Sequence, residues 1–129
     1  MYRTPRVPTQ HQKTIGETWE ELACRELCRR GYAILARRYR TRLGEIDIIA
    51  RDEGVLVFVE VKARSGHHFG GPLAAVTAVK QRKLIRMALD YLAHSRLSGV
   101  ACRFDGVGVL IRDGRLEVEV VTNAFGAGW

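Results

Sequence analysis

Two short segments in which apolar residues alternate with charged ones restrict the fold of this chain more than any other feature. Residues 44–50 (GEIDIIA) and 57–62 (VFVEVK) have the period of two and the β-branched and aromatic content typical of strands. Between them, Asp52, Glu53 and Gly54 are residues that favour tight turns. The sequence therefore predicts a β-hairpin.

The register of this hairpin decides what its charged side chains can do. With a two-residue turn, Asp47 lies opposite Glu60 and Glu45 lies opposite Lys62. Strand side chains alternate between faces, so all four would project from one face, with opposed Cβ atoms about 5 Å apart. Because glutamate is unfavourable at positive φ, a three-residue loop with Gly54 in the left-handed region is an equal alternative.

The charge balance points to a polyanionic partner. The 129 residues contain 21 Lys+Arg and 14 Asp+Glu, which gives a net charge of +7, and 17 of the basic residues are arginine. Arginine binds phosphate in a planar, bidentate geometry, so nucleic acid is the natural candidate. Many small soluble proteins are also basic without binding nucleic acid.

Length and composition predict one globular domain over residues 15–129, preceded by a flexible basic tail over residues 1–14. No apolar run is long enough to span a membrane, and the first residues lack the apolar segment of a signal peptide. Three cysteines without a metal-type spacing are typical of a reduced protein. We therefore expect a cytoplasmic protein with no membrane association.

The remaining pattern predicts an α/β fold. Apolar residues at helical spacing indicate helices at about 16–30 and 74–95, and further strands are expected at 32–36, 102–111 and 115–121. Antiparallel hairpins joined by a crossover helix imply a mixed five-stranded sheet with flanking helices. The predicted core stripe of the second helix comprises Leu84, Ile85, Ala88, Leu89 and Leu92.

Each predicted helix carries one polar residue on its apolar face. Glu20 falls beside Trp19, Ala23 and Leu27, where an unpaired carboxylate is costly, so we expect a site role or a half-solvated position. Gln81 falls in the middle of the second helix's apolar face, where it either reaches an active site or bonds neighbouring backbone groups.

Asp47, Glu60, Lys62 and Glu20 form a set suited to metal-assisted phosphodiester hydrolysis. Carboxylates suit Mg²⁺ or Mn²⁺, which lower the pKa of a bound water and polarise a phosphoryl oxygen. Asp47 and Glu60 would be direct ligands, and Lys62 would be the cation that positions the water. Glu20 would be a further ligand or an acceptor of hydrogen bonds from the metal's waters. Glu45 either contacts Lys62 or marks the entrance to the strand.

The segments Gly44-Glu45-Ile46-Asp47 and Val57-Phe58-Val59-Glu60-Val61-Lys62 together resemble the signature of the bacterial YraN family. The resemblance extends through residues 16–20, 80–84, 103–105 and 123–125. This family is similar to archaeal Holliday-junction resolvases and to the restriction-endonuclease-like PD-(D/E)XK nucleases. The resemblance implies their three-layer fold, with Asp47, Glu60 and Lys62 as core site residues and Glu20 and Gln81 in support.

We therefore expect a Mg²⁺-dependent (or Mn²⁺-dependent) nuclease acting on DNA rather than RNA, with branched DNA in repair or recombination as a candidate substrate. Resolving a junction would need two active sites and hence a homodimer. The alternatives are a nucleic-acid-binding module without turnover and a subunit that docks an acidic partner. Candidate backbone contacts are Arg40, Arg42, Arg64 and Lys83. His67 and His68 are loop residues for which phosphate contact or proton transfer competes with a solvent-facing role.

Overall fold

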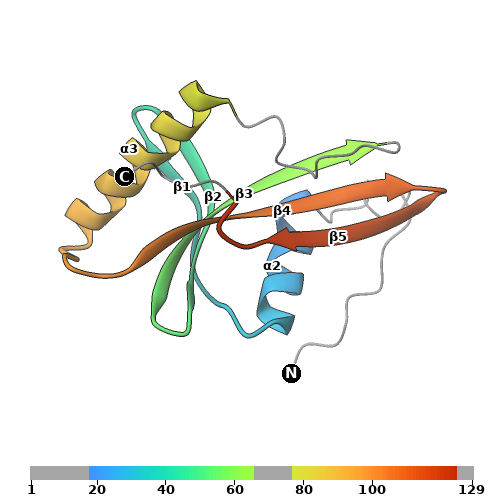
Figure 1. Cartoon of the computed structure of the whole chain (residues 1–129), viewed down its shortest axis with the longest axis horizontal. Helices are drawn as coiled ribbons and strands as arrows, with labels where there is room; N and C mark the ends of the chain where they lie inside the picture. The colour runs from blue at the N-terminus through green and yellow to red at the C-terminus, as the bar shows by residue number, and fades with distance from the viewer. Residues whose placement is uncertain (1–17, 66–76, 125–129) are drawn as a thin grey trace.

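The computed structural model describes residues 18–65 and 77–124, which form a mixed β-sheet with a helix packed on each face (Figure 1). The elements in chain order are α2 (Trp19–Arg29), β1 (Ala33–Thr41), β2 (Gly44–Asp52), β3 (Val55–Ser65), α3 (Ala78–His94), β4 (Cys102–Arg112) and β5 (Arg115–Val121). The strands lie in the order β1-β2-β3-β4-β5, where β3 and β4 run parallel and the other neighbours run antiparallel. The predicted α/β class, element order and mixed five-stranded sheet are confirmed.

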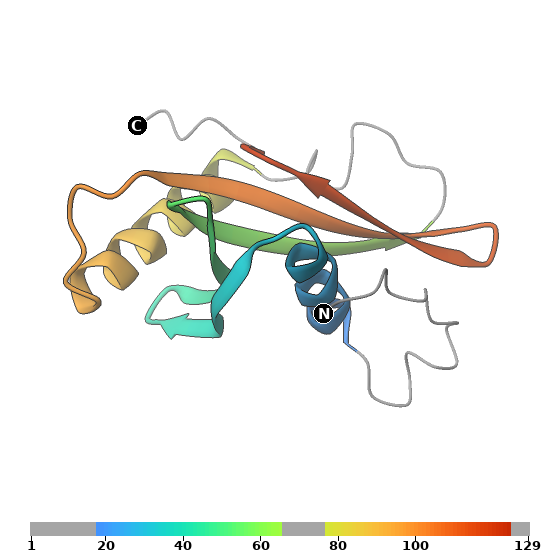
Figure 2. The same ribbon diagram turned by 90° about the horizontal axis from the view of Figure 1, so that it is seen from below.

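The two helices bury opposite faces of the strands. Ala23 and Leu27 of α2 pack against Ile48 and Val57, whereas residues of α3 pack on the face that carries Phe58. Figure 2 shows α2 beneath the long strands β3, β4 and β5. Central strands that are apolar on both faces need such cover, which explains their near-continuous Val and Ile content. In the described part of the chain, no helix is long and apolar enough to cross a membrane.

Helix α2 begins with a capping box at Thr18. The Thr18 hydroxyl accepts a hydrogen bond from the Glu21 backbone N–H at 3.0 Å, and the Glu21 carboxylate accepts one from the Thr18 N–H at 3.0 Å. These bonds satisfy backbone donors that the first turn leaves unpaired. The helix therefore starts at Trp19, later than the predicted start near residue 16, although the Thr-x-x-Glu signature was present in the sequence.

The core stripe of α3 was predicted partly wrongly. Leu84 and Ala88 are buried as expected, but Met87 is buried as well, and Leu89 is 54% exposed. At 100° per residue, Leu89 lies about 140° around the helix from Leu84. The helix thus packs through residues 84, 87, 88 and 91. A count of apolar residues does not distinguish this side of the helix from the neighbouring side that carries Leu89.

The hairpin between β2 and β3 has the register of a two-residue turn. Its backbone pairs run from Asp52–Val55 to Ile48–Val59. Glu53 and Gly54 have φ values of 49° and 86°, so both turn residues are left-handed. The three-residue alternative is therefore wrong.

Candidate active site

The candidate site lies at the point where β2 separates from β3. Their paired positions end at Ile48–Val59, one step before Asp47 and Glu60 would face each other. There the Asp47 carboxylate accepts a hydrogen bond from the Val61 backbone N–H at 2.8 Å. The carboxylate thus satisfies a strand N–H beyond the end of the ladder, and this contact anchors Asp47 beside β3.

The side chains of β2 do not alternate strictly at this point. Ile46 packs with Ile49 on the α3 face, whereas Ile48 packs on the α2 face. On the neighbouring strand β1, Arg38 has a positive φ of 53° between the pairs Arg37–Ile48 and Tyr39–Ile46. A local distortion of both strands therefore places Asp47 at a twist in the sheet, as expected where ladders are interrupted.

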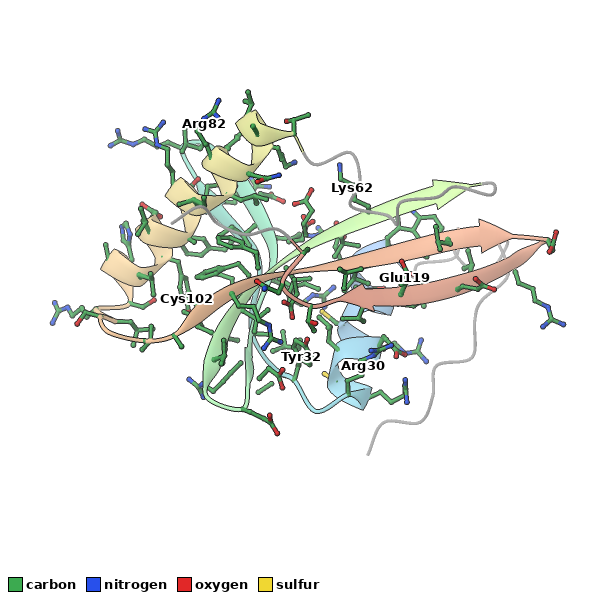
Figure 3. The ribbon with its side chains drawn as sticks, in the orientation of Figure 1. Arg30, Tyr32, Lys62, Arg82, Cys102 and Glu119 are labelled. Atoms are coloured by element: carbon green, nitrogen blue, oxygen red, sulfur yellow. The ribbon has the colours of Figure 1, made fainter. Side chains whose placement is uncertain are left out.

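Glu60 is a buried carboxylate flanked by two lysines. It is 7% exposed and lies 3.3 Å from the ammonium of Lys80 and 3.8 Å from that of Lys62. Figure 3 shows Lys62 on β3 between α3, which carries Arg82, and β5, which carries Glu119. A buried carboxylate requires such compensation, because its isolated charge is strongly disfavoured away from water.

Asp47 lies in an environment that disfavours its charge. Burial raises the pKa of Asp47 to about 6, against a hydrogen bond from Val61 that lowers it. The nearby carboxylates of Glu60 and Glu20 raise this pKa further, whereas Lys80 lowers it. The structure therefore brings Glu60 and Glu20 within electrostatic range of Asp47.

Glu20 lies within electrostatic range of Asp47, whereas Gln81 lies on the other helix, next to Lys80. Glu20 of α2 is half-buried and pairs with Arg38 of β1 at 3.3 Å. Gln81 of α3 is half-buried and follows Lys80 directly, and its backbone N–H donates to the Thr77 carbonyl at 2.9 Å. Both residues lie on the helices that were predicted to carry them, and Glu20 has a basic partner of its own.

Glu45 does not contact Lys62 as the predicted pairing suggested. Its carboxylate lies 3.0 Å from the Arg40 guanidinium, and Arg40 is also its register partner on β1. The interruption of alternation between Ile46 and Ile48 separates Glu45 from the Asp47 side of the hairpin. Glu45 therefore belongs to the outer β1–β2 ribbon.

Two glycines of β4 lie beside the candidate residues of β3. In the parallel register Glu60 pairs with Gly106 and Lys62 with Gly108, and the ladder continues without a shift. Side chains of paired positions share a face, so β4 places no side chain next to either charged group. Both glycines are buried.

Among residues 18–65 and 77–124, no three His, Cys, Asp or Glu side chains are grouped closely enough to form a metal-binding cluster. Arg40, Arg42 and Lys83, predicted to contact nucleic acid, are exposed. His67, His68, the tail at 1–14 and the side chain of Arg64 lie outside the described residues.

Lys80 is the site residue that sequence reasoning missed. The helical wheel assigned it to the flank of α3, about 100° from Gln81. A lysine side chain has four methylene groups, so from this flank it reaches the Glu60 carboxylate. The usable signal was its position one residue before Gln81, which the helical wheel placed on the apolar face of α3.

Comparison with known sequences identifies the family to which this chain belongs. The sequence profile of the uncharacterised protein family UPF0102 matches residues 19–109, which include all the site residues described above. A UPF0102 protein of Symbiobacterium thermophilum is 51% identical over 116 residues, covering 89% of this chain and 98% of the relative. A UPF0102 protein of Desulfosudis oleivorans is 48% identical over 116 residues (90% and 93%), and one of Geobacter metallireducens is 44% identical over 115 residues (89% and 94%). The chain belongs to the UPF0102 family.

Proposed function

We propose that this protein is a metal-dependent nuclease that hydrolyses DNA phosphodiester bonds, with a restriction-endonuclease-like PD-(D/E)XK site and branched DNA among its substrates. The observation that carries the proposal is the position of Asp47, half-buried at the β2–β3 fork, within electrostatic range of Glu60 and Glu20. Lys62 lies beside Glu60 on the same strand. This combination of residues supports the resemblance drawn from the sequence.

The donor set fits Mg²⁺ or Mn²⁺. Mg²⁺ in enzymes is typically held by one or two carboxylates and keeps several waters, so a compact three-residue cluster is not required. Asp47 and Glu60 would hold the ion, and Glu20 would accept hydrogen bonds from its waters. Besides burial, the carboxylates of Glu60 and Glu20 raise the pKa of Asp47, and such a gathering of negative charge suits a cation.

The chain's own residues supply the remaining requirements of phosphodiester hydrolysis. When bound, the metal ion would act as a Lewis acid toward the phosphate and lower the pKa of a water. Lys62 would orient the attacking water or stabilise the negative charge that grows on the phosphate oxygens. Gly106 and Gly108 keep the adjacent strand free of side chains next to Glu60 and Lys62. The net charge of +7 favours binding of a polyanionic substrate.

The test is cleavage of linear, flapped and four-way-junction DNA by the purified full-length protein with Mg²⁺, with Mn²⁺ or with EDTA. Asp47→Asn and Glu60→Gln remove ligand charge while keeping side-chain size, and each should lower the cleavage rate about 100-fold or more. Glu119→Gln is the matched control, since Glu119 is an exposed acid of β5. If the parent cuts none of these substrates, or if the site variants cut as fast as the control, the proposed function is wrong.

The two lysines around Glu60 favour a second candidate function, a nucleic-acid-binding module with the same fold and no turnover. Lys62 and Lys80 already neutralise Glu60 without any metal ion. This candidate predicts salt-sensitive DNA binding that survives the loss of Asp47, Glu60 and Lys62, together with no cleavage by the parent.

A further inference from the structure

A cleft separates the end of the β1–β2 hairpin from the C-terminal half of α3. Its volume is about 980 Å³, and it is lined on one side by residues 39–43 and on the other by Arg86, Met87, Asp90 and His94. The two views show the hairpin end and α3 side by side (Figures 1 and 2). Neither the candidate carboxylates nor Lys62 line this cleft.

The cleft lining has an excess of positive charge among the residues that the structure describes. Arg42 and Arg86 line it from opposite sides, both are exposed, and neither forms an ion pair within the described ranges. Arg40 adds a third guanidinium, 82% exposed, at 3.0 Å from Glu45. Asp90 is the acidic residue of the lining; it accepts a hydrogen bond from the Tyr39 hydroxyl at 2.9 Å and lies 3.5 Å from the His94 ring, and the three arginines outnumber it. Unpaired guanidinium groups facing each other across a cleft suit a phosphate ligand.

The hairpin end that carries Arg42 is stabilised by hydrogen bonds and by packing. The Thr41 hydroxyl accepts a hydrogen bond from the Leu43 N–H at 3.0 Å and donates one to the Gly44 carbonyl at 3.1 Å. Leu43 also packs on the core beneath α3. Arg42 thus projects from an ordered turn, which lowers the entropic cost of binding a ligand there.

The position of the cleft relative to the fork favours a nucleic-acid strand over a free anion. Arg86 follows Lys80, which contacts Glu60, by about 9 Å along α3. Arg40 is paired with Glu45, about 7 Å along β2 from Asp47. A duplex strand advances about 3.4 Å per nucleotide, so the cleft lies roughly two to three nucleotides from the fork.

We propose that this cleft binds the phosphodiester backbone of DNA, with Arg42 and Arg86 contacting phosphates that flank the one held at the β2–β3 fork. The inference rests on the proposed function and deepens it, since it assigns the path by which the substrate strand leaves the site. Backbone contacts of this kind set register and affinity without reading sequence.

The experiment measures binding of fluorescein-labelled duplex and four-way-junction DNA by fluorescence anisotropy, with full-length protein in EDTA at several salt concentrations. The Arg42→Ala/Arg86→Ala variant should bind about tenfold more weakly, and the slope of log Kd against log salt should fall by about 1 to 2. The matched control, Arg51→Ala/Arg115→Ala, removes the same charge from two exposed turn-proximal positions outside the cleft. It should change Kd by less than about threefold.

Equal weakening by the two double variants would mean general charge attraction and would overturn the cleft assignment, as would no weakening by either. A labelled acidic peptide that binds the parent as tightly as DNA does, and loses as much affinity in Arg42→Ala/Arg86→Ala, would identify a docking site for an acidic protein instead. Binding in EDTA does not depend on turnover. A parent that fails to cleave but loses DNA affinity selectively through Arg42 and Arg86 would therefore refute the nuclease function and support the cleft.

Discussion

Asp47 combines a structural contact with a charge that its surroundings disfavour. One carboxylate oxygen ends the β2–β3 ladder by accepting the Val61 N–H, and burial together with Glu60 and Glu20 raises the pKa of the group. Asp47, Glu60 and Lys62 were predicted from the sequence as candidate site residues, because the alternation expected of strands places them on one face. Lys80 was not, because its contact with Glu60 depends on how α3 is placed over the sheet.

Replacing Lys80 tests how the buried Glu60 is compensated. Lys80→Met should lower the free energy of unfolding in EDTA by about 1 to 2 kcal/mol, because the more distant Lys62 is then the one remaining cation beside Glu60 among the described residues. The same variant should gain more thermal stability from added Mg²⁺ or Mn²⁺ than the parent, since a cation would replace the lost charge. Thermal and urea unfolding with and without the ion measure both effects.

Lys83→Met is the control for this experiment, because Lys83 is an exposed lysine on the same helix and forms no ion pair with a described residue. Indistinguishable behaviour of the two variants would show that the Lys80–Glu60 contact contributes nothing specific.

At the scale of elements, the β2–β3 turn departs from what its sequence favours. Two-residue hairpin turns with positive φ at both positions prefer Asn-Gly, yet the first position here is Glu53, with φ of 49°. This is why sequence reasoning held the two-residue and three-residue loops equal. Pairing of buried apolar residues from Ile48–Val59 through Ala50–Val57 overrides the local preference.

Glu53→Asn should therefore stabilise the protein by about 0.5 to 1 kcal/mol, because asparagine tolerates the left-handed conformation better than glutamate. Urea unfolding gives the change in free energy. Glu53→Ala serves as the reference that removes the charge without this conformational benefit. An asparagine variant no more stable than the alanine variant would contradict the turn geometry.

At the scale of the whole molecule, a buried polar network joins parts of the chain that are distant in sequence. Asp105 of β4 is 1% exposed and accepts hydrogen bonds from the Tyr32 hydroxyl at 2.7 Å, from Arg103 at 2.8 Å and from the Asn123 N–H at 2.9 Å. Arg103 also bonds Asp52 at 2.8 Å. Figure 3 shows Tyr32 near the end of α2 that carries Arg30. The network thus ties β2, β4, the residue before β1 and the segment after β5 to one another.

The network predicts a loss of stability at alkaline pH. Burial, with the hydrogen bond to Asp105 and its negative charge, raises the pKa of Tyr32 from 10.0 to about 12. The folded state therefore keeps this proton to higher pH than the unfolded state does. The contribution of protonated Tyr32 to the stability of the folded state is complete below pH 10. This contribution is lost as the pH rises from there toward about 12.

Tyr32→Phe should remove this part of the pH dependence of the free energy of unfolding, which amounts to up to about 3 kcal/mol. At neutral pH the same variant should be less stable by about 1 to 2 kcal/mol, because hydrogen bonds are lost. Urea unfolding of parent and variant across this pH range measures both. Parallel curves for the two proteins would show that Tyr32 is not the titrating group.

The sequence by itself determined the class and order of the elements, and it identified Asp47, Glu60 and Lys62 as candidate site residues. These follow from periodicity and turn residues, which act over a few positions. The tertiary structure alone decided that Asp47 bonds Val61, that Glu45 pairs with Arg40, that Lys80 reaches Glu60 and that Leu89 faces solvent. Each of these depends on a strand distortion or on the rotation and placement of a helix. Such features arise from packing between distant segments, so no local pattern encodes them.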